Sequence, residues 1–339
     1  MTLFNFSIGG ERLEVEAPEL NGYKWLFYQV LYCYYLSAKK AKLIKSVVLS
    51  RPLLLFIQSY FQKNSIDYTS GGEPGVENKF HGLIKTDPKK HAVMLTSGKD
   101  SVHLLKFLVE KYGAENIIGI YVDRINKSEA IYEAAASKIL ADLFQIQFKK
   151  VEVTNSIDLN REGHNIGLRD QLLLTLALPF IFEFGAAKVW YGVTHHEQPP
   201  QLWTETQEAH QFVLEVIRKM WQVDLEVHFH CENGFHEFDI LRDAVQDLGL
   251  LSLTSSCYCQ KNFREHRNDL LTSKFPKQYL YHGCGSCVKC MRINGGILAF
   301  TSNFTRDFAQ HWFKQIEKYP QDETLNSLRP LVADKFERK

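Results

Sequence analysis

The residues with types and spacing suited to phosphate chemistry form one short turn of this 339-residue chain, Thr96-Ser97-Gly98-Lys99-Asp100-Ser101. The apolar run 91–95 before it predicts a buried strand, and residues 102–109 after it predict a helix with an apolar face. Such a turn presents backbone N–H groups and the positive end of the helix dipole to an anion. Lys99 adds a mobile positive charge, and Asp100 suits a magnesium ion that accompanies phosphate groups. The turn therefore predicts a phosphate site.

One alternative for this turn stays open on the residues alone. The Walker pattern, G-x-x-x-x-G-K-[ST], is absent, so the turn is not a phosphate loop of that type. An ordinary strand-to-helix turn that happens to contain Ser97-Gly98 is the alternative, because short motifs match by chance.

Composition predicts a globular chain without a dominant charge. Hydrophobic residues make up 45% and charged residues 23%, and the formal net charge of +1 gives no global case for binding nucleic acid. No uncharged apolar run approaches the length of about 18 residues that a membrane span needs. Residues 1–6 lack the pattern of a signal peptide, and the seven cysteines are too unevenly spread for a secreted disulfide framework. We expect a cytoplasmic protein.

The hydrophobic pattern divides the chain into three parts. Residues 1–88 predict an additional α+β domain, with a β-hairpin over 3–16 and an aromatic-rich helical stretch over 23–61 that Arg51-Pro52 interrupts. We interpret the aromatic stripe as core or interface, with a ligand-stacking surface as the alternative. Residues 89–300 form the main domain, and 301–339 a helical tail.

The main domain alternates predicted strands and helices. The strands are 91–96, 117–122, 147–153, 188–193 and 225–230, and the helices are 101–112, 127–143, 167–184, 204–221 and 236–248. This order predicts an α/β fold, a doubly wound parallel sheet with helices on both faces.

Further site candidates follow from that fold, because ligands bind beyond the carboxyl ends of parallel strands. Thr96, Asp123 and Thr194 lie at three predicted ends and could meet around one ligand, although each could instead be a simple cap. Arg169 opens the helix 167–184, where its charge opposes the helix dipole. An anion partner explains that placement, and an ion pair with Asp170 or Glu162 is the alternative.

The segment after Thr194 contains two adjacent histidines, which point to opposite sides of an extended chain and make a poor shared metal site. Trp203 could stack on a flat ring or serve as a buried anchor.

Cysteines cluster near the carboxyl end. Cys284, Cys287 and Cys290 form two interlocking C-x-x-C steps, with Cys257 and Cys259 upstream. Four thiolates suit tetrahedral zinc, and an all-sulfur site would be closed and structural. An iron–sulfur cluster and a redox dithiol are the alternatives.

The turn is similar to the pyrophosphatase-type phosphate loop (PP-loop), S-G-G-x-D-S, of enzymes that split ATP into AMP and pyrophosphate. Together with the cysteines it resembles the QueC family, the 7-cyano-7-deazaguanine synthases, whose carboxyl region carries S-C-Y and then C-G-x-C-x-x-C-x-x-R. The matching strings here are Ser256-Cys257-Tyr258 and residues 284–290, with Arg292 close behind. The family's R-N matches Arg169-Asp170, its G-V-N matches residues 192–194, and the resemblance covers roughly 90–300.

The resemblance implies an ATP-dependent reaction of 7-carboxy-7-deazaguanine, in which the carboxylate becomes an acyl-adenylate and an amine displaces AMP. In the housekeeping enzymes the amine is ammonia, and a second activation gives the nitrile. ATP, Mg²⁺ and Zn²⁺ are the implied cofactors. The implied nucleotide-binding residues are Thr96, Ser97, Gly98, Lys99, Asp100, Ser101, Asp123, Gly192 and Thr194. The implied catalytic residues are Lys99, Asp100 and Arg169, and the zinc ligands are Cys257, Cys284, Cys287 and Cys290.

Four departures set this chain apart from the compact QueC enzymes. The substrate loop after G-V-N is rewritten, Glu237 stands where the family has a lysine, the spacer from Cys257 to Cys284 is longer, and the first 88 residues have no counterpart. They suggest a divergent paralogue, like the QueC-like proteins of bacterial antiphage operons, some of which join the deazaguanine to a protein amine. Residues 1–85 would then dock a protein substrate, or form a homodimer contact.

Two other functions stay open. A PP-loop enzyme that modifies tRNA would need a basic face, which the sequence does not show. The second alternative is a catalytically inactive scaffold that binds a nucleotide, in which the altered T-S-G loop no longer cleaves ATP.

Overall fold

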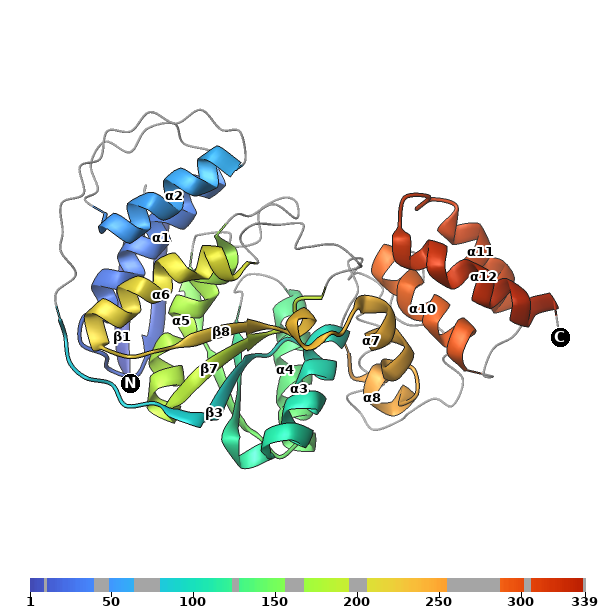
Figure 1. The fold of residues 1–339 in the computed structure, drawn as a ribbon, viewed down its shortest axis with the longest axis horizontal. Coiled ribbons are helices and arrows are strands. Elements are labelled where there is room, and N and C mark those ends of the chain that lie inside the picture. The colour runs from blue at the N-terminus through green and yellow to red at the C-terminus, as the bar shows by residue number, and fades with distance from the viewer. Residues whose placement is uncertain are drawn as a thin grey trace.

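A computed structural model of the chain describes residues 1–8, 11–39, 49–63, 80–123, 128–155, 168–194, 206–254, 287–301 and 306–337. Its centre is a five-stranded sheet of order β5-β4-β3-β7-β8, in which all neighbours run parallel (Figure 1). The strands are β3 (Asp87–Met94), β4 (Ile117–Val122), β5 (Gln147–Val151), β7 (Ala186–Tyr191) and β8 (Glu226–Phe229). The expected α/β fold with a parallel sheet is confirmed.

Helices cover both faces of this sheet because its strand residues alternate between two apolar clusters. Val93 and Leu95 pack with α3 (Lys99–Tyr112) and α4 (Ser128–Leu143) on one face. Ala92 and Met94 belong to the larger cluster that holds α5 (Arg169–Phe184) and α6 (Gln207–Trp221). A strand buried on both faces reads as a continuous apolar run, which is how 91–95 reads in the sequence.

A small second sheet of order β1-β2-β6 combines two amino-terminal strands with a short strand from the middle of the chain. The predicted hairpin is β1 (Thr2–Ile8) and β2 (Glu11–Ala17), and β6 (Val153–Asn155) pairs antiparallel with β2. The single strand predicted over 147–153 is therefore wrong in one respect. Residues 147–151 belong to the parallel sheet, and the chain passes at the exposed Glu152 to the small sheet, where Val153 is buried opposite Val15.

Two helices, α1 (Tyr23–Lys39) and α2 (Arg51–Lys63), follow the hairpin, and the second begins at the predicted interruption. The aromatic side chains of α1 that the structure buries include Tyr23, Phe27 and Tyr34. They belong to the same apolar cluster as β3, β7, α5 and α6, and α1 packs on α5 while α2 packs on α6. The aromatic stripe is thus core shared with the main sheet.

The carboxyl-terminal helices form a separate apolar cluster at the opposite end of the molecule from α1 and α2 (Figure 1). The helices are α7 (Glu237–Ala244), α8 (Leu248–Ser252), α10 (Val288–Phe300), α11 (Arg306–Ile316) and α12 (Glu323–Glu337). The helix predicted over 236–248 ends four residues early, because Asp247 caps α8 by accepting a hydrogen bond from the Leu250 N–H at 2.9 Å. Within the described ranges, no helix has the length and apolarity to cross a membrane.

Candidate active site

The predicted phosphate turn connects the carboxyl end of β3 to the first residues of α3. Two hydroxyl groups close it, since Thr96 Oγ1 and Ser101 Oγ share a hydrogen bond of 2.9 Å. The Gly98 N–H points to the same Thr96 oxygen at 3.4 Å. Gly98 is the N-cap residue of α3, and as a glycine it supplies no side-chain cap of its own. The positive end of this 14-residue helix, with no cap from its N-cap side chain, therefore lies at the carboxyl end of β3.

Ser97 lies in the middle of this turn. Its side chain is fully buried, and its Oγ has no hydrogen-bond partner among the described residues. A buried hydroxyl without a partner costs about 1–3 kcal/mol, so such a group is expected where a ligand or an ordered water supplies the missing bond.

Lys99 and Asp100 form a partly buried ion pair at the same turn. The Lys99 ammonium lies 2.5 Å from Asp100 Oδ1, and the Thr194 hydroxyl donates to that oxygen at 3.3 Å. The structure thus brings together three predicted site residues from two different strand ends. Lys99 is 5% exposed while Asp100 is 28% exposed, so the carboxylate faces solvent from a partly open position.

Gly192 is a further predicted residue at this place. A Cβ added to it would lie 2.8 Å from the backbone nitrogen of Ser101 and 3.0 Å from its Cα. No real Cβ approaches backbone this closely, so only glycine allows the end of β7 to touch the start of α3.

A chain of ion pairs leads from this turn to the carboxyl-terminal helices. Glu237, the first residue of α7, lies 3.4 Å from the Lys99 ammonium. Its two carboxylate oxygens accept hydrogen bonds of 2.7 and 2.8 Å from Nη1 of Arg292 in α10. The remaining face of that guanidinium donates to Asp322, at 2.7 Å from Nη2. Arg292 thus joins α7 to α10 and to the residue that precedes α12.

The opposite charges in this series of ion pairs stabilise one another. Burial alone would lower the pKa of Lys99, but the carboxylates of Asp100 and Glu237 outweigh burial and raise the pKa above its usual value. Burial would likewise lower the pKa of Arg292, whereas Asp322 and Glu237 raise it. Both side chains are therefore charged in the folded protein at neutral pH.

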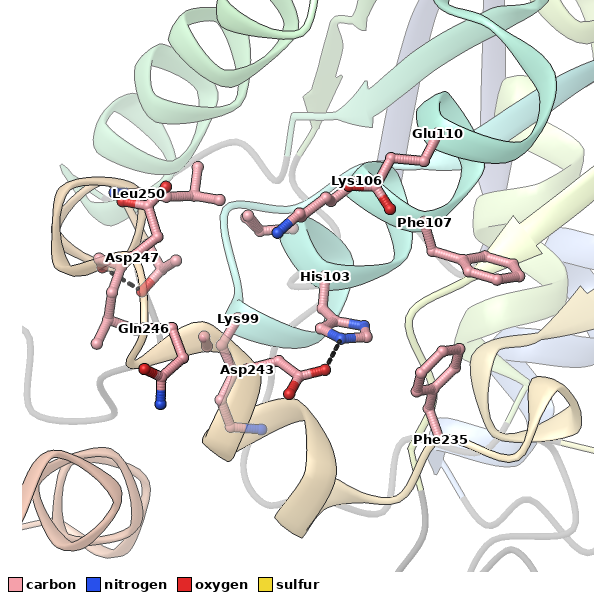
Figure 2. Close-up of a pocket in the computed structure, with 14 residues that line it drawn as sticks. Lys99, His103, Lys106, Phe107, Glu110, Phe235, Asp243, Gln246, Asp247 and Leu250 are labelled. Carbon is pink, nitrogen blue, oxygen red and sulfur yellow. Dashed lines mark hydrogen bonds and ion pairs between the residues drawn. The ribbon is translucent and has the colours of Figure 1, made fainter. Parts of the chain in front are cut away.

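A cavity of about 340 Å³ opens beside the turn, between α3 and the pair α7–α8 (Figure 2). Lys99, His103, Phe107 and Phe235 are among the side chains that line it. The two phenylalanines meet edge to face, with ring centroids 5.4 Å apart. The volume fits a small organic molecule, and a lining of rings with a few polar groups is typical of such sites.

Two histidines extend from the wall of this cavity toward the end of β8. His103 Nδ1 and His230 Nε2 are 2.7 Å apart, and His103 Nε2 lies 3.4 Å from Asp243 Oδ2, the contact dashed in Figure 2. Burial lowers the pKa of His103, which Asp243 partly offsets, and burial together with His103 lowers the pKa of His230 to about 3. Both rings are neutral at pH 7.

The sequence analysis did not assign this cavity, although one pattern in the sequence pointed to it. Lys99, His103, Lys106 and Glu110 recur at helical spacing of three to four residues and so share one side of α3. A polar stripe that continues from a phosphate turn indicates a helix face turned toward a ligand or a second element. The facing residues of α7 and α8 have no comparable signal.

Two other predicted site residues have protein partners. Asp123, at the end of β4, pairs with Lys150 of β5 at 2.6 Å. Arg169 lies 3.2 Å from Asp170, which is the ion pair that the sequence left open as the alternative to an anion partner. Arg169 is 40% exposed, so its guanidinium remains accessible to solvent.

Of the four predicted zinc ligands, the structure describes Cys287 and Cys290, and both are buried where α10 begins. Two buried thiols one helical turn apart fit half of a tetrahedral sulfur site. Cys257 and Cys284 lie outside the described residues, as do Cys259, residues 195–205 with Trp203, and the turn at residues 9–10. Within the described part of the chain, no group of three or more His, Cys, Asp or Glu side chains is placed to hold a metal.

No protein-family model and no curated protein sequence matches the chain. Among the solved structures that share some similarity is the U34-tRNA thiolase NcsA from Methanococcus maripaludis with its [4Fe-4S] cluster. It has 11% sequence identity and a TM-score of 0.28, and the match covers 74% of each chain. At that TM-score and identity the similarity supports no conclusion about this chain.

Proposed function

We propose that the chain is an ATP-dependent enzyme that activates a carboxylic acid as its adenylate. The single observation that supports this most is the start of α3 at this turn, which carries the Lys99 ammonium and follows the buried Ser97 hydroxyl, for which the described residues offer no hydrogen-bond partner. In this proposal the turn would offer a hydroxyl donor, a helix dipole and a positive charge to an anion. Such a cluster suits the phosphate groups of a nucleotide.

The proposed reaction needs positioning and charge more than a protein nucleophile. A carboxylate oxygen of the substrate attacks the α-phosphorus of ATP, the bond between the α-phosphorus and the bridging oxygen breaks, and pyrophosphate leaves. Lys99 would stabilise the negative charge on the leaving pyrophosphate, and the Ser97 hydroxyl would hold a phosphate oxygen. Asp100 is the residue that would hold a magnesium ion, which neutralises phosphate charge when bound.

The proposed substrate is 7-carboxy-7-deazaguanine, on the basis of the resemblance to QueC. The cavity beside Lys99 supports a flat heterocycle, because Phe107 and Phe235 offer apolar rings and Asp243 offers a carboxylate to N–H groups. An amine then attacks the acyl carbon and AMP leaves. Ammonia and a protein amine are the two acceptors to distinguish, and mass spectrometry of the products does so directly.

We also propose one structural zinc per chain, held by Cys257, Cys284, Cys287 and Cys290. The support is the sequence spacing together with the buried thiols of Cys287 and Cys290 at the start of α10. Elemental analysis of the purified protein should find one zinc per chain, and iron in its place would contradict the proposal.

The Asp100→Ala variant tests the nucleotide assignment. We expect pyrophosphate release in the presence of the deazaguanine acid to fall by at least about a hundredfold, because cation and lysine positioning are both lost. Asp100 also neutralises buried Lys99, so some stability should be lost as well. Asp100→Asn keeps the size of the side chain and serves as the second variant. A folded variant of either kind with unchanged pyrophosphate release would remove Asp100 from the site.

A further inference from the structure

One carboxylate, that of Glu237, is shared between the lysine of the phosphate turn and an arginine of the carboxyl-terminal helices. The two contacts differ in strength. Arg292 donates to both oxygens at 2.7 and 2.8 Å, whereas the Lys99 ammonium lies 3.4 Å from one of them. Glu237 is 7% exposed, so its charge is largely shielded from water. A buried carboxylate of this kind depends on the cations around it.

The arrangement has a consequence for any anion that approaches the turn. Lys99 already contacts two carboxylates, so a phosphate group competes with both of them for the ammonium. The longer contact, to Glu237, is the weaker of the two by distance. When Lys99 moves, Glu237 keeps both of its hydrogen bonds from Arg292, and Asp322 holds that guanidinium in place from its other side.

We propose that Glu237 binds Lys99 when no phosphate group is present. We propose also that Arg292, by balancing the charge of Glu237, favours the transfer of Lys99 from Glu237 to a phosphate group. This inference rests on the proposed function of the turn. Without Arg292, more of the Glu237 charge would be balanced by Lys99, so the lysine would be held back from the anion. Arg292 and Glu237 are then positioning residues that act through Lys99 and set the affinity for pyrophosphate groups.

The proposal predicts effects of opposite sign in two variants and a rescue in their combination. Inorganic pyrophosphate with magnesium is the probe, and its Kd is measured by isothermal titration calorimetry. Arg292→Gln should weaken binding about tenfold, since neighbouring charges couple on that scale. Glu237→Gln removes the competing carboxylate and should bind as tightly as the wild type or more tightly. The double variant should return to within about threefold of the Glu237→Gln value.

Controls separate this role from a structural one. Each variant is checked for its melting temperature and its zinc content, because Arg292 lies in the same helix as Cys290. Arg292→Lys keeps the positive charge but cannot donate to both carboxylate oxygens as a guanidinium does, so it should weaken pyrophosphate binding less than Arg292→Gln. It replaces Arg292→Gln in the test if that variant does not fold.

Two results would overturn the inference while leaving the proposed function intact. One is weakened binding in Arg292→Gln that Glu237→Gln does not rescue, and the other is weakened binding in Glu237→Gln alone. A wild-type protein that binds neither pyrophosphate nor ATP would overturn the proposed function, and this inference with it.

Discussion

At the scale of single residues, the site depends on a glycine in a different part of the sequence from the turn it supports. Gly192 directly follows β7 and lies against the backbone of Ser101, where a Cβ would be 2.8 Å from the nitrogen. We predict that Gly192→Ala displaces the start of α3 and lowers pyrophosphate release by about a hundredfold, because small displacements of positioning groups have effects of this size. Steady-state kinetics alongside a melting curve would check it. Wild-type activity in the variant would show that the contact does not position the turn.

Residue types in the turn were readable from the sequence, but their partners were not. Thr96, Ser97, Lys99 and Asp100 lie within five consecutive residues, so their chemistry was visible in one string. Thr194 was predicted to join them because strand ends share an edge of a parallel sheet and because residues 192–194 match the G-V-N of the QueC family, and its hydroxyl does donate to Asp100. Glu237 was noted as a departure from the QueC pattern, yet its contact with Lys99 depends on how α7 packs, which no local pattern encodes.

At the scale of elements, the helix α10 carries two adjacent glycines in unequal surroundings. A Cβ on Gly295 would lie 2.6 Å from the ring of Trp312, whereas one on Gly296 would meet Val245 at an ordinary 3.4 Å. We predict that Gly295→Ala destabilises the protein by about 1–3 kcal/mol through overpacking. Gly296→Ala, the matched control in the same helix, should be neutral or stabilising by up to about 1 kcal/mol. Urea unfolding of both variants measures the difference, and equal effects would contradict the packing described.

The positions of the main strands and of the helices around them could be predicted from the hydrophobic pattern, since strands buried on both faces give unbroken apolar runs. The change of sheet between β5 and β6 could not be predicted from the hydrophobic pattern. The alternation of buried and exposed residues continues from Val151 through Glu152 to Val153 without a break, although the strand changes sheets there. Only pairing with β2, which lies far away in the sequence, distinguishes the two strands.

At the scale of the whole molecule, two buried histidines in different places should make stability depend on pH. Burial lowers the pKa of His91 to about 4 and that of His230 to about 3, against a usual value of 6.5. The unfolded chain therefore binds more protons than the folded one below about pH 6.5, and stability falls as pH falls toward the folded pKa values. The slope should approach about 1.4 kcal/mol per pH unit for each histidine.

Urea unfolding between pH 7 and pH 5 measures this slope, in a range where few carboxylates titrate. His230→Gln removes one of the two groups while keeping a polar partner for His103, so it should reduce the slope. Stability that is constant across this range would contradict the neutral, buried state of both rings.

The central claim is that this chain splits ATP between its α- and β-phosphates at the turn of Thr96 to Ser101. Phosphorus NMR of ATP with magnesium, the protein and 7-carboxy-7-deazaguanine tests it most directly. The account predicts AMP or its acyl ester together with an equal amount of pyrophosphate in the wild type, and neither in Asp100→Ala. Formation of ADP and inorganic phosphate, or cleavage that persists in Asp100→Ala, would contradict it.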